Sequence, residues 1–77
     1  ALVNHVTLTE QPGTDMVQGF EIRIYPLPYG APVTVYRGTT IGHKAICPFP
    51  TVRTEKIEIL LDRKANVTAT PQYLPRF

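Results

Sequence analysis

The 77-residue chain contains neither serine nor tryptophan, and it has a single cysteine, Cys47. Without serine it cannot use the hydroxyl nucleophile of serine hydrolases. Without tryptophan it lacks the large flat ring on which sugars commonly stack. One cysteine can form neither an intrachain disulfide nor a cysteine-rich zinc site. A domain this small without cross-links relies on packing or on a partner for its stability.

Strong charge and long apolar runs are also missing. The formal net charge is +2 at pH 7, which is weak attraction for a polyanion and does not favour a nucleic-acid partner. No stretch approaches the roughly 18 consecutive apolar residues of a membrane-spanning helix, so we expect no membrane span. The chain starts at Ala1 without methionine and contains the glycosylation sequon Asn66-Val67-Thr68. Both features favour a secreted protein, although the compartment stays open.

What the chain does contain is frequent threonine, valine and isoleucine, whose branching at Cβ suits strands better than helices. Eight prolines and five glycines interrupt these residues at the intervals typical of short strands joined by turns. Apolar residues make up 43% of the chain and charged residues 18%, which indicates a folded domain rather than a disordered segment. Because the chain is too short for two cores, the composition predicts one all-β domain.

Alternation of apolar and polar residues locates about six short strands. We expect them over residues 2–9, 16–25, 33–37, 40–47, 56–62 and 67–70. The clearest is the second, in which Phe20, Ile22 and Ile24 face the core while the residues between them face solvent. Pro48-Phe49-Pro50 is expected to end the fourth strand. Residues 62–66 are expected to form a hairpin connection between the last two strands.

Six short strands with no crossover helix predict a small antiparallel β-sandwich or a partly open β-barrel. We expect residues 1–71 to form this domain and residues 72–77 to form an extended C-terminal tail. The strand count is similar to that of small secreted fungal effectors with a β-sandwich, which usually carry a disulfide and share no residue motif with this chain. The predicted core consists of Val6, Leu8, Phe20, Ile22, Ile24, Val33, Val35, Ile41, Ile57, Ile59, Leu61 and Val67.

No group of residues adds up to a catalytic or metal site. Four positions along a strand separate His43 and Cys47 by about 13 Å, which is beyond the hydrogen-bond reach of a nucleophile and its base. A packed thiol and a surface imidazole are therefore expected. His5 and His43 lack the close spacing that pre-forms metal sites. Glu55 and Glu58 have basic neighbours that indicate a solvated strand entry. We expect a non-enzymatic protein without cofactor or metal.

Two proline-flanked segments, residues 25–32 and 47–50, are the best candidates for binding. Prolines restrict the backbone before a partner docks, so less entropy is lost on binding. The side chains that offer amphipathic contact area are Tyr25, Leu27, Tyr29 and Phe49. This pattern predicts a non-catalytic protein-binding module, such as a secreted effector or an inhibitor. The alternative is that the same rings cap the open ends of the sheet.

Two further functions remain open. Exposed strand edges and the tail could add to the sheet of a neighbour, which would make the chain a structural subunit of a homo-oligomeric, viral or phage assembly. A small barrel could also bind nucleic acid through a basic face interleaved with aromatic rings. The residues for this second alternative are Tyr36, Arg37, Lys44 and Arg53.

Overall fold

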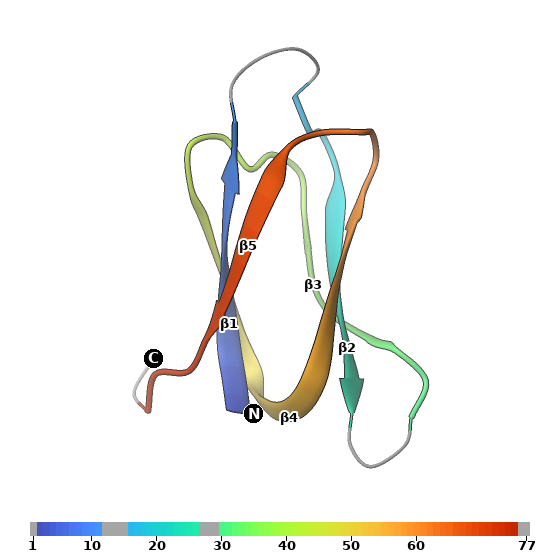
Figure 1. Cartoon of the computed structure of the whole chain (residues 1–77), viewed down its shortest axis with the longest axis vertical. Coiled ribbons are helices and arrows are strands. Elements are labelled where there is room, and N and C mark those ends of the chain that lie inside the picture. Colours follow the sequence, from blue (N-terminus) through green and yellow to red (C-terminus); the bar gives the residue numbers. More distant parts are fainter. Residues whose placement is uncertain (1, 12–15, 27–29, 76–77) are drawn as a thin grey trace.

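The computed structural model describes residues 2–11, 16–26 and 30–75. Its strands are β1 (Leu2–Glu10), β2 (Phe20–Pro26), β3 (Val33–Gly38), β4 (Ala45–Leu61) and β5 (Val67–Gln72). They form one antiparallel sheet in the order β3-β2-β4-β1-β5, as Figure 1 shows. The predicted all-β antiparallel class is confirmed. Within the described ranges, no helical segment has the length and hydropathy needed to cross a bilayer.

The sheet folds on itself because β4 belongs to two layers. Residues 45–53 of β4 pair with β1, and residues 54–61 pair with β2. Figure 1 shows β4 turning sharply between these halves. The first layer therefore consists of β5, β1 and the first half of β4, and the second layer consists of the second half of β4, β2 and β3. This open arrangement lies between the predicted sandwich and the predicted barrel.

A bulge lets β4 continue through its prolines. Asn4 of β1 lies opposite three residues of β4, positions 49–51, so the hydrogen-bond ladder is interrupted there. Pro50 lies in this bulge, where its missing N–H is not needed. Pro48 lies outside the bulge, opposite His5. The bond from Gln11 to Asn66 shows that the N–H and C=O groups of His5 point toward β5, so the ladder with β1 needs no N–H from Pro48. The prediction that Pro48-Phe49-Pro50 ends a strand is therefore wrong. Residues 45–47 and 56–61, from two segments expected as separate strands, belong to one strand, β4. Residues 40–44 precede that strand, and the described strands number five rather than six.

Thr54 stabilises the turn of β4. A second bulge places Tyr25 of β2 opposite two residues of β4, positions 55–56, and such bulges bend the strand that carries them. The Thr54 hydroxyl is buried and accepts hydrogen bonds from the N–H groups of Tyr25 (3.3 Å) and Lys56 (3.2 Å). It also lies within donating distance of both their carbonyl oxygens, at 2.9 and 2.8 Å. One side chain thus joins β2 to the bend of β4.

The core lies between the two layers. The predicted core residues that are fully buried are Val6, Leu8, Phe20, Ile22, Ile24 and Ile41. Those that are half-buried are Val35, Ile57, Ile59, Leu61 and Val67. Val33 is 48% exposed because it begins the edge strand β3. The prediction that it belongs to the core is therefore wrong. The pattern missed Val3, Val17 and Phe49, which are buried.

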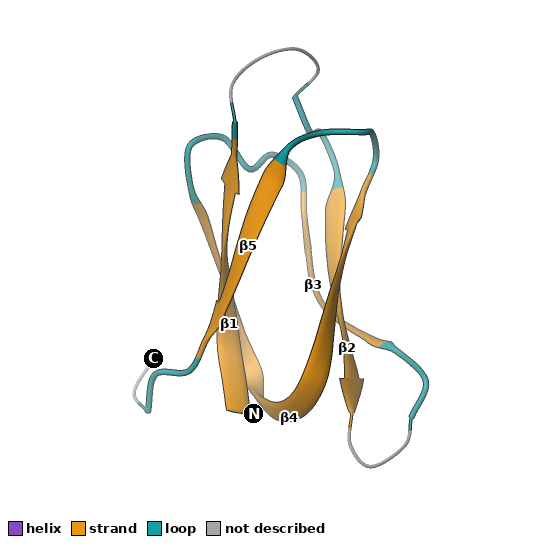
Figure 2. Ribbon diagram, viewed as in Figure 1, coloured by secondary structure: helices purple, strands orange, loops and turns teal. Residues whose placement is uncertain are grey.

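The last connection crosses between layers instead of forming a hairpin. Figure 2 shows residues 62–66 as a loop that leads from β4 to β5, but β5 pairs with β1. The predicted hairpin is wrong because β5 occupies the free edge of β1, so it does not pair with the strand that precedes it. The division into a domain of residues 1–71 and a tail of residues 72–77 stays a prediction.

Candidate functional site

Cys47 and His43 do not form a catalytic pair. Cys47 is 1% exposed and packs in the core, and burial raises the pKa of its thiol. The thiolate, which is the reactive form, is therefore disfavoured. His43 lies before β4 and is exposed. The structure thus has the packed thiol and the surface imidazole that the sequence predicted.

His5 takes part in a structural hydrogen-bond network. Its Nδ1 lies 2.9 Å from Oδ1 of Asn4, and its Nε2 lies 3.0 Å from Oε1 of Gln72. The Asn4 side chain also accepts from the N–H of Leu74 at 3.1 Å and donates to the Leu74 carbonyl. This network ties the end of β5 and the residues after it to β1. Within the described residues, no group of three or more potential metal ligands occurs.

The four residues predicted to bind a partner do not form one described surface. Leu27 and Tyr29 lie outside the described residues. Phe49 is 8% exposed and belongs to the core, so the expectation of an exposed ring is wrong at that position, and the bulge in β4 explains why. Tyr25 is half-buried on β2, where Nζ of Lys56 lies 4.6 Å from its ring centroid. A partner-binding role for Tyr25 stays a prediction.

The residues considered for nucleic-acid binding are spread over the molecule. Lys44 directly precedes Ala45, at the end of β4 that pairs with the end of β1. Arg53 pairs with Leu2 at the beginning of β1, so these two cations lie at opposite ends of β1, about 20–25 Å apart along it. Tyr36 stacks on the core residue Phe20, with ring centroids 6.0 Å apart. The structure therefore does not bring this set together.

Charged side chains on the outside of the second layer are paired with one another. The Glu21 carboxylate accepts hydrogen bonds from Nε of Arg23 (2.7 Å), the Thr34 hydroxyl (2.9 Å) and Nε of Arg37 (3.1 Å). The bonds from Arg23 and then Thr34 hold the pKa of Glu21 below its usual value, and the same contact raises the pKa of Arg23. The charges and hydrogen-bonding groups of these side chains are paired with one another, which indicates a solvated outer face rather than a ligand site.

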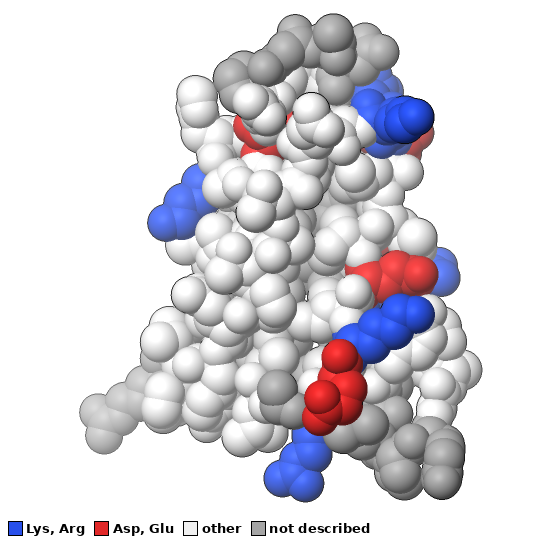
Figure 3. All heavy atoms as spheres, viewed as in Figure 1, with Lys and Arg blue, Asp and Glu red and all other residues white. Residues whose placement is uncertain are grey.

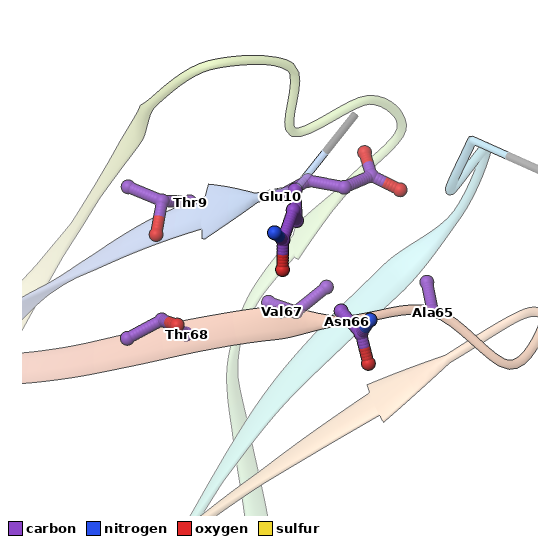
Figure 4. A pocket seen from close by; sticks show the side chains of 7 residues that line it. Thr9, Glu10, Ala65, Asn66, Val67 and Thr68 are labelled. Carbon is purple, nitrogen blue, oxygen red and sulfur yellow. The ribbon is translucent and has the colours of Figure 1, made fainter. Parts of the chain in front are cut away.

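A polar depression of about 500 Å³ lies where β1 ends and β5 begins. Its lining residues are Thr9, Glu10, Gln11, Ala65, Asn66, Val67 and Thr68. Figure 4 shows the Glu10 carboxylate pointing away from Thr9 and Thr68. Its Oε2 accepts the N–H of Val17 at 2.8 Å, whereas its Oε1 is buried and has no hydrogen-bond partner among the described residues. Because Oε1 is shielded from solvent, it is not available to a ligand in the depression.

An apolar cleft of about 290 Å³ lies between β5 and the second half of β4. The β4–β5 cleft, as we call it, is lined by Val3, Thr54, Glu55, Ile57, Ile59, Ala69 and Pro71. Ile57 and Ile59 pair with buried residues of β2 and so face the core, yet they are only half-buried. On the opposite wall, Ala69 pairs with the buried Leu8 and is exposed. The core is therefore left uncovered along this cleft.

The surface of β5 beside this cleft carries little charge. Figure 3 shows the surface over β5 as largely uncharged, whereas acidic and basic atoms gather over the lower centre and the right of the view. β5 contains no charged residue, and among the described residues that line the cleft only Glu55 is charged. The sequence pattern predicted Ile57 and Ile59 of the β4 wall as core residues, but it did not predict Ala69 of the β5 wall. It contained no signal for the cleft itself, because the cleft depends on which strands pair.

The comparisons with known proteins concern the fold. No family model matches the chain, and no curated protein matches it. A solved structure from Bacteroides thetaiotaomicron, named "putative alpha-L-fucosidase", is similar to it with a TM-score of 0.77 and 19% sequence identity. The similarity covers 92% of this chain and 17% of that one. At this identity the likeness shows the fold alone, and the chain spans about a sixth of the neighbour's length.

Proposed function

We propose that this chain is a non-catalytic protein-binding module whose contact surface is the β4–β5 cleft. One observation carries the proposal: core-facing residues on both walls, Ile57 and Ile59 on β4 and Ala69 on β5, remain accessible. Covering apolar surface stabilises a complex by about 25 cal/mol per Å². An apolar patch with a polar rim is typical of an interaction site. The contact surface therefore differs from the proline-flanked segments that the sequence favoured.

Two further findings support this proposal. In the neighbour from Bacteroides thetaiotaomicron, a unit of similar fold accounts for 17% of the chain, which is the situation of a module that works beside other polypeptide. The side chains most able to act as a nucleophile and a base, Cys47 and His43, are respectively buried and exposed. Neither finding identifies the partner. A carbohydrate role does not follow from the neighbour's name.

Photo-cross-linking from the cleft tests the proposal. A photoreactive amino acid is placed at Ala69, which faces the cleft, and separately at its neighbour Thr68, which faces the opposite side of β5. The protein is irradiated in extract of the cells that produce it. Any polypeptide that cross-links from position 69 and not from position 68 is then purified. Its affinity is measured for the wild-type chain and for Ala69→Arg and Thr68→Arg.

We expect Ala69→Arg to weaken binding of the purified partner at least about tenfold, because it buries a charge in an apolar contact. Thr68→Arg should bind within about twofold of wild type, since a surface substitution away from the contact has little effect. Equal binding by both variants would contradict the proposal. If light scattering shows a stable multimer that Ala69→Arg dissociates, the alternative of a homo-oligomeric subunit replaces it.

A further inference from the structure

We infer that the occupant of the β4–β5 cleft is an extended strand from another polypeptide, which pairs with β4 on one side and with β5 on the other. The inference rests on the proposed function and adds the chemistry of the partner: a flexible segment in which small branched apolar residues alternate with polar ones. Its basis is the direction of the backbone hydrogen-bonding groups along both walls of the cleft.

On the β4 wall, the direction of the backbone follows from one hydrogen bond. The N–H of Asp62 donates to the carbonyl of Gly19 at 2.9 Å, so these residues form a hydrogen-bonded pair in the ladder between β4 and β2. Such pairs alternate with non-bonded pairs along antiparallel strands. Ile57 and Ile59, which pair with β2 in the same register, are therefore non-bonded. Their N–H and C=O groups point away from β2, into the cleft.

The β5 wall has the same arrangement. The N–H of Gln11 donates to the carbonyl of Asn66 at 3.0 Å, in register with the ladder between β1 and β5. By the same alternation, the N–H and C=O groups of Val67 and Ala69 point away from β1. Pro71 falls at the next such position, where its missing N–H leaves the ladder with β1 intact. Within the described residues, no strand pairs with this edge of β5.

Two backbone edges thus face the same cleft. The second half of β4 is paired only with β2 among the described strands, and its other edge is the one that Ile57 and Ile59 present. A strand placed in the cleft would meet donors and acceptors on both sides, as an interior strand of a sheet does. Figure 1 shows the second half of β4 rising from its turn while β5 descends, so the strand would run parallel to one of them and antiparallel to the other.

The side chains of the cleft define what the strand must carry. Alternate residues of a strand point to opposite faces, so every second residue of the occupant would face Val3, Ile57 and Ile59 in the core. The volume of about 290 Å³ lies at the lower end of ligand pockets, which suits small aliphatic side chains better than aromatic rings. The residues between them would point to the outer, solvent-facing side and should be polar.

A folded second copy fits the cleft less well than a free segment. The cleft requires a strand with both edges unpaired, since it offers hydrogen-bonding groups on two sides. The edge strands of a second copy, β3 and β5, are each already paired along one edge, with β2 and β1 respectively. A small apolar ligand would fill the cleft but would bury the facing N–H and C=O groups without partners, which is costly. A flexible segment satisfies both requirements.

Peptide binding with amide hydrogen exchange tests the inference. The probe is a short capped peptide of alternating valine and threonine with a lysine at each end for solubility. The control peptide has the same sequence with N-methyl groups on alternate residues, which remove the N–H groups of one edge. Affinity is measured for both peptides with the wild-type chain, Ala69→Arg and Thr68→Arg. Exchange of the Ile57, Ile59, Val67 and Ala69 amides is followed by NMR with and without the probe.

We expect the probe to bind and to slow exchange of those four amides, and N-methylation or Ala69→Arg to weaken binding at least about tenfold. Thr68→Arg should bind normally. Equal binding of the N-methylated peptide, or no binding of the probe, would overturn strand pairing. The proposed function would then still stand if the cross-linked partner depends on Ala69, and it would fall as well if that dependence is absent.

Discussion

The two halves of β4 differ in a way that their sequences do not suggest. The first half contains Pro48 and Pro50 and has a bulge, yet its inward residues Cys47 and Phe49 are 1% and 8% exposed. The second half alternates regularly beyond its own bulge at positions 55–56, yet Ile57 and Ile59 are only half-buried, although both are larger apolar residues than cysteine. An alternating pattern determines which side of a strand faces the core. How well that side is covered depends on the neighbouring strands, and the second half of β4 faces an unfilled cleft.

Truncation in each half should give the largest contrast. Phe49→Ala removes a buried ring and should lower the free energy of unfolding by about 3–5 kcal/mol. Ile59→Ala removes a side chain that is already partly exposed to water, so it should lower the free energy of unfolding by only about 1–2 kcal/mol. Urea unfolding followed by circular dichroism measures both values. If Phe49→Ala does not fold, Phe49→Leu gives a milder test of the same site. Equal losses in the two halves would contradict the comparison.

The turn between the halves should depend on Thr54. Thr54→Val keeps the shape of the side chain but removes the hydroxyl that joins the backbones of Tyr25 and Lys56. Leaving buried backbone groups without this partner should lower the free energy of unfolding by about 2 kcal/mol. The exposed Thr51 provides a matched control, and Thr51→Val should stay within about 0.5 kcal/mol of wild type. A similar, small effect of both substitutions would show that the bulge alone makes the turn.

Much of the fold could be predicted from the sequence because local rules act on local segments. Strand β2 is an example, since the alternation of Phe20, Ile22 and Ile24 indicated both the strand and its buried face. The same rules were wrong at Pro48 and Pro50. A proline ends a strand when its missing N–H is needed for the ladder, and whether it is needed depends on Asn4 and His5 of β1, which lie far away in the sequence.

The candidate site was less predictable for the same reason. Its walls consist of residues such as Ile59 and Ala69, which the sequence places on ordinary strands. They become a cleft only because β5 pairs with β1 instead of with β4, and strand order is not encoded in any one segment. The proline-flanked rings were predicted to bind a partner because proline indicates a stiff backbone. Proline does not indicate that a neighbouring side chain is exposed, and Phe49 is in the core.

The outer faces of the two layers should respond differently to acid. In the second layer, Glu21 is held by Arg23, Thr34 and Arg37, and these contacts lower its pKa. A folded pKa below the unfolded value, which is about 4.3 for glutamate, means that the stabilisation is complete above roughly pH 5. It is lost as the pH falls through the lower folded value. No ion pair joins two described residues of the first layer.

Glu21→Gln should therefore have the smallest effect at neutral pH and a clear pH signature. The stability difference between wild type and Glu21→Gln, measured by urea unfolding, should be constant from pH 7 to about pH 5 and should shrink toward pH 3. Added salt should reduce the difference, because the pairs are solvent-exposed. Amide exchange at low pH should rise first in β2 and β3, which carry these side chains, and later in β1. If the difference stays constant down to pH 3, Glu21 titrates as it does in the unfolded chain, and the outer faces of the two layers do not differ in their response to acid.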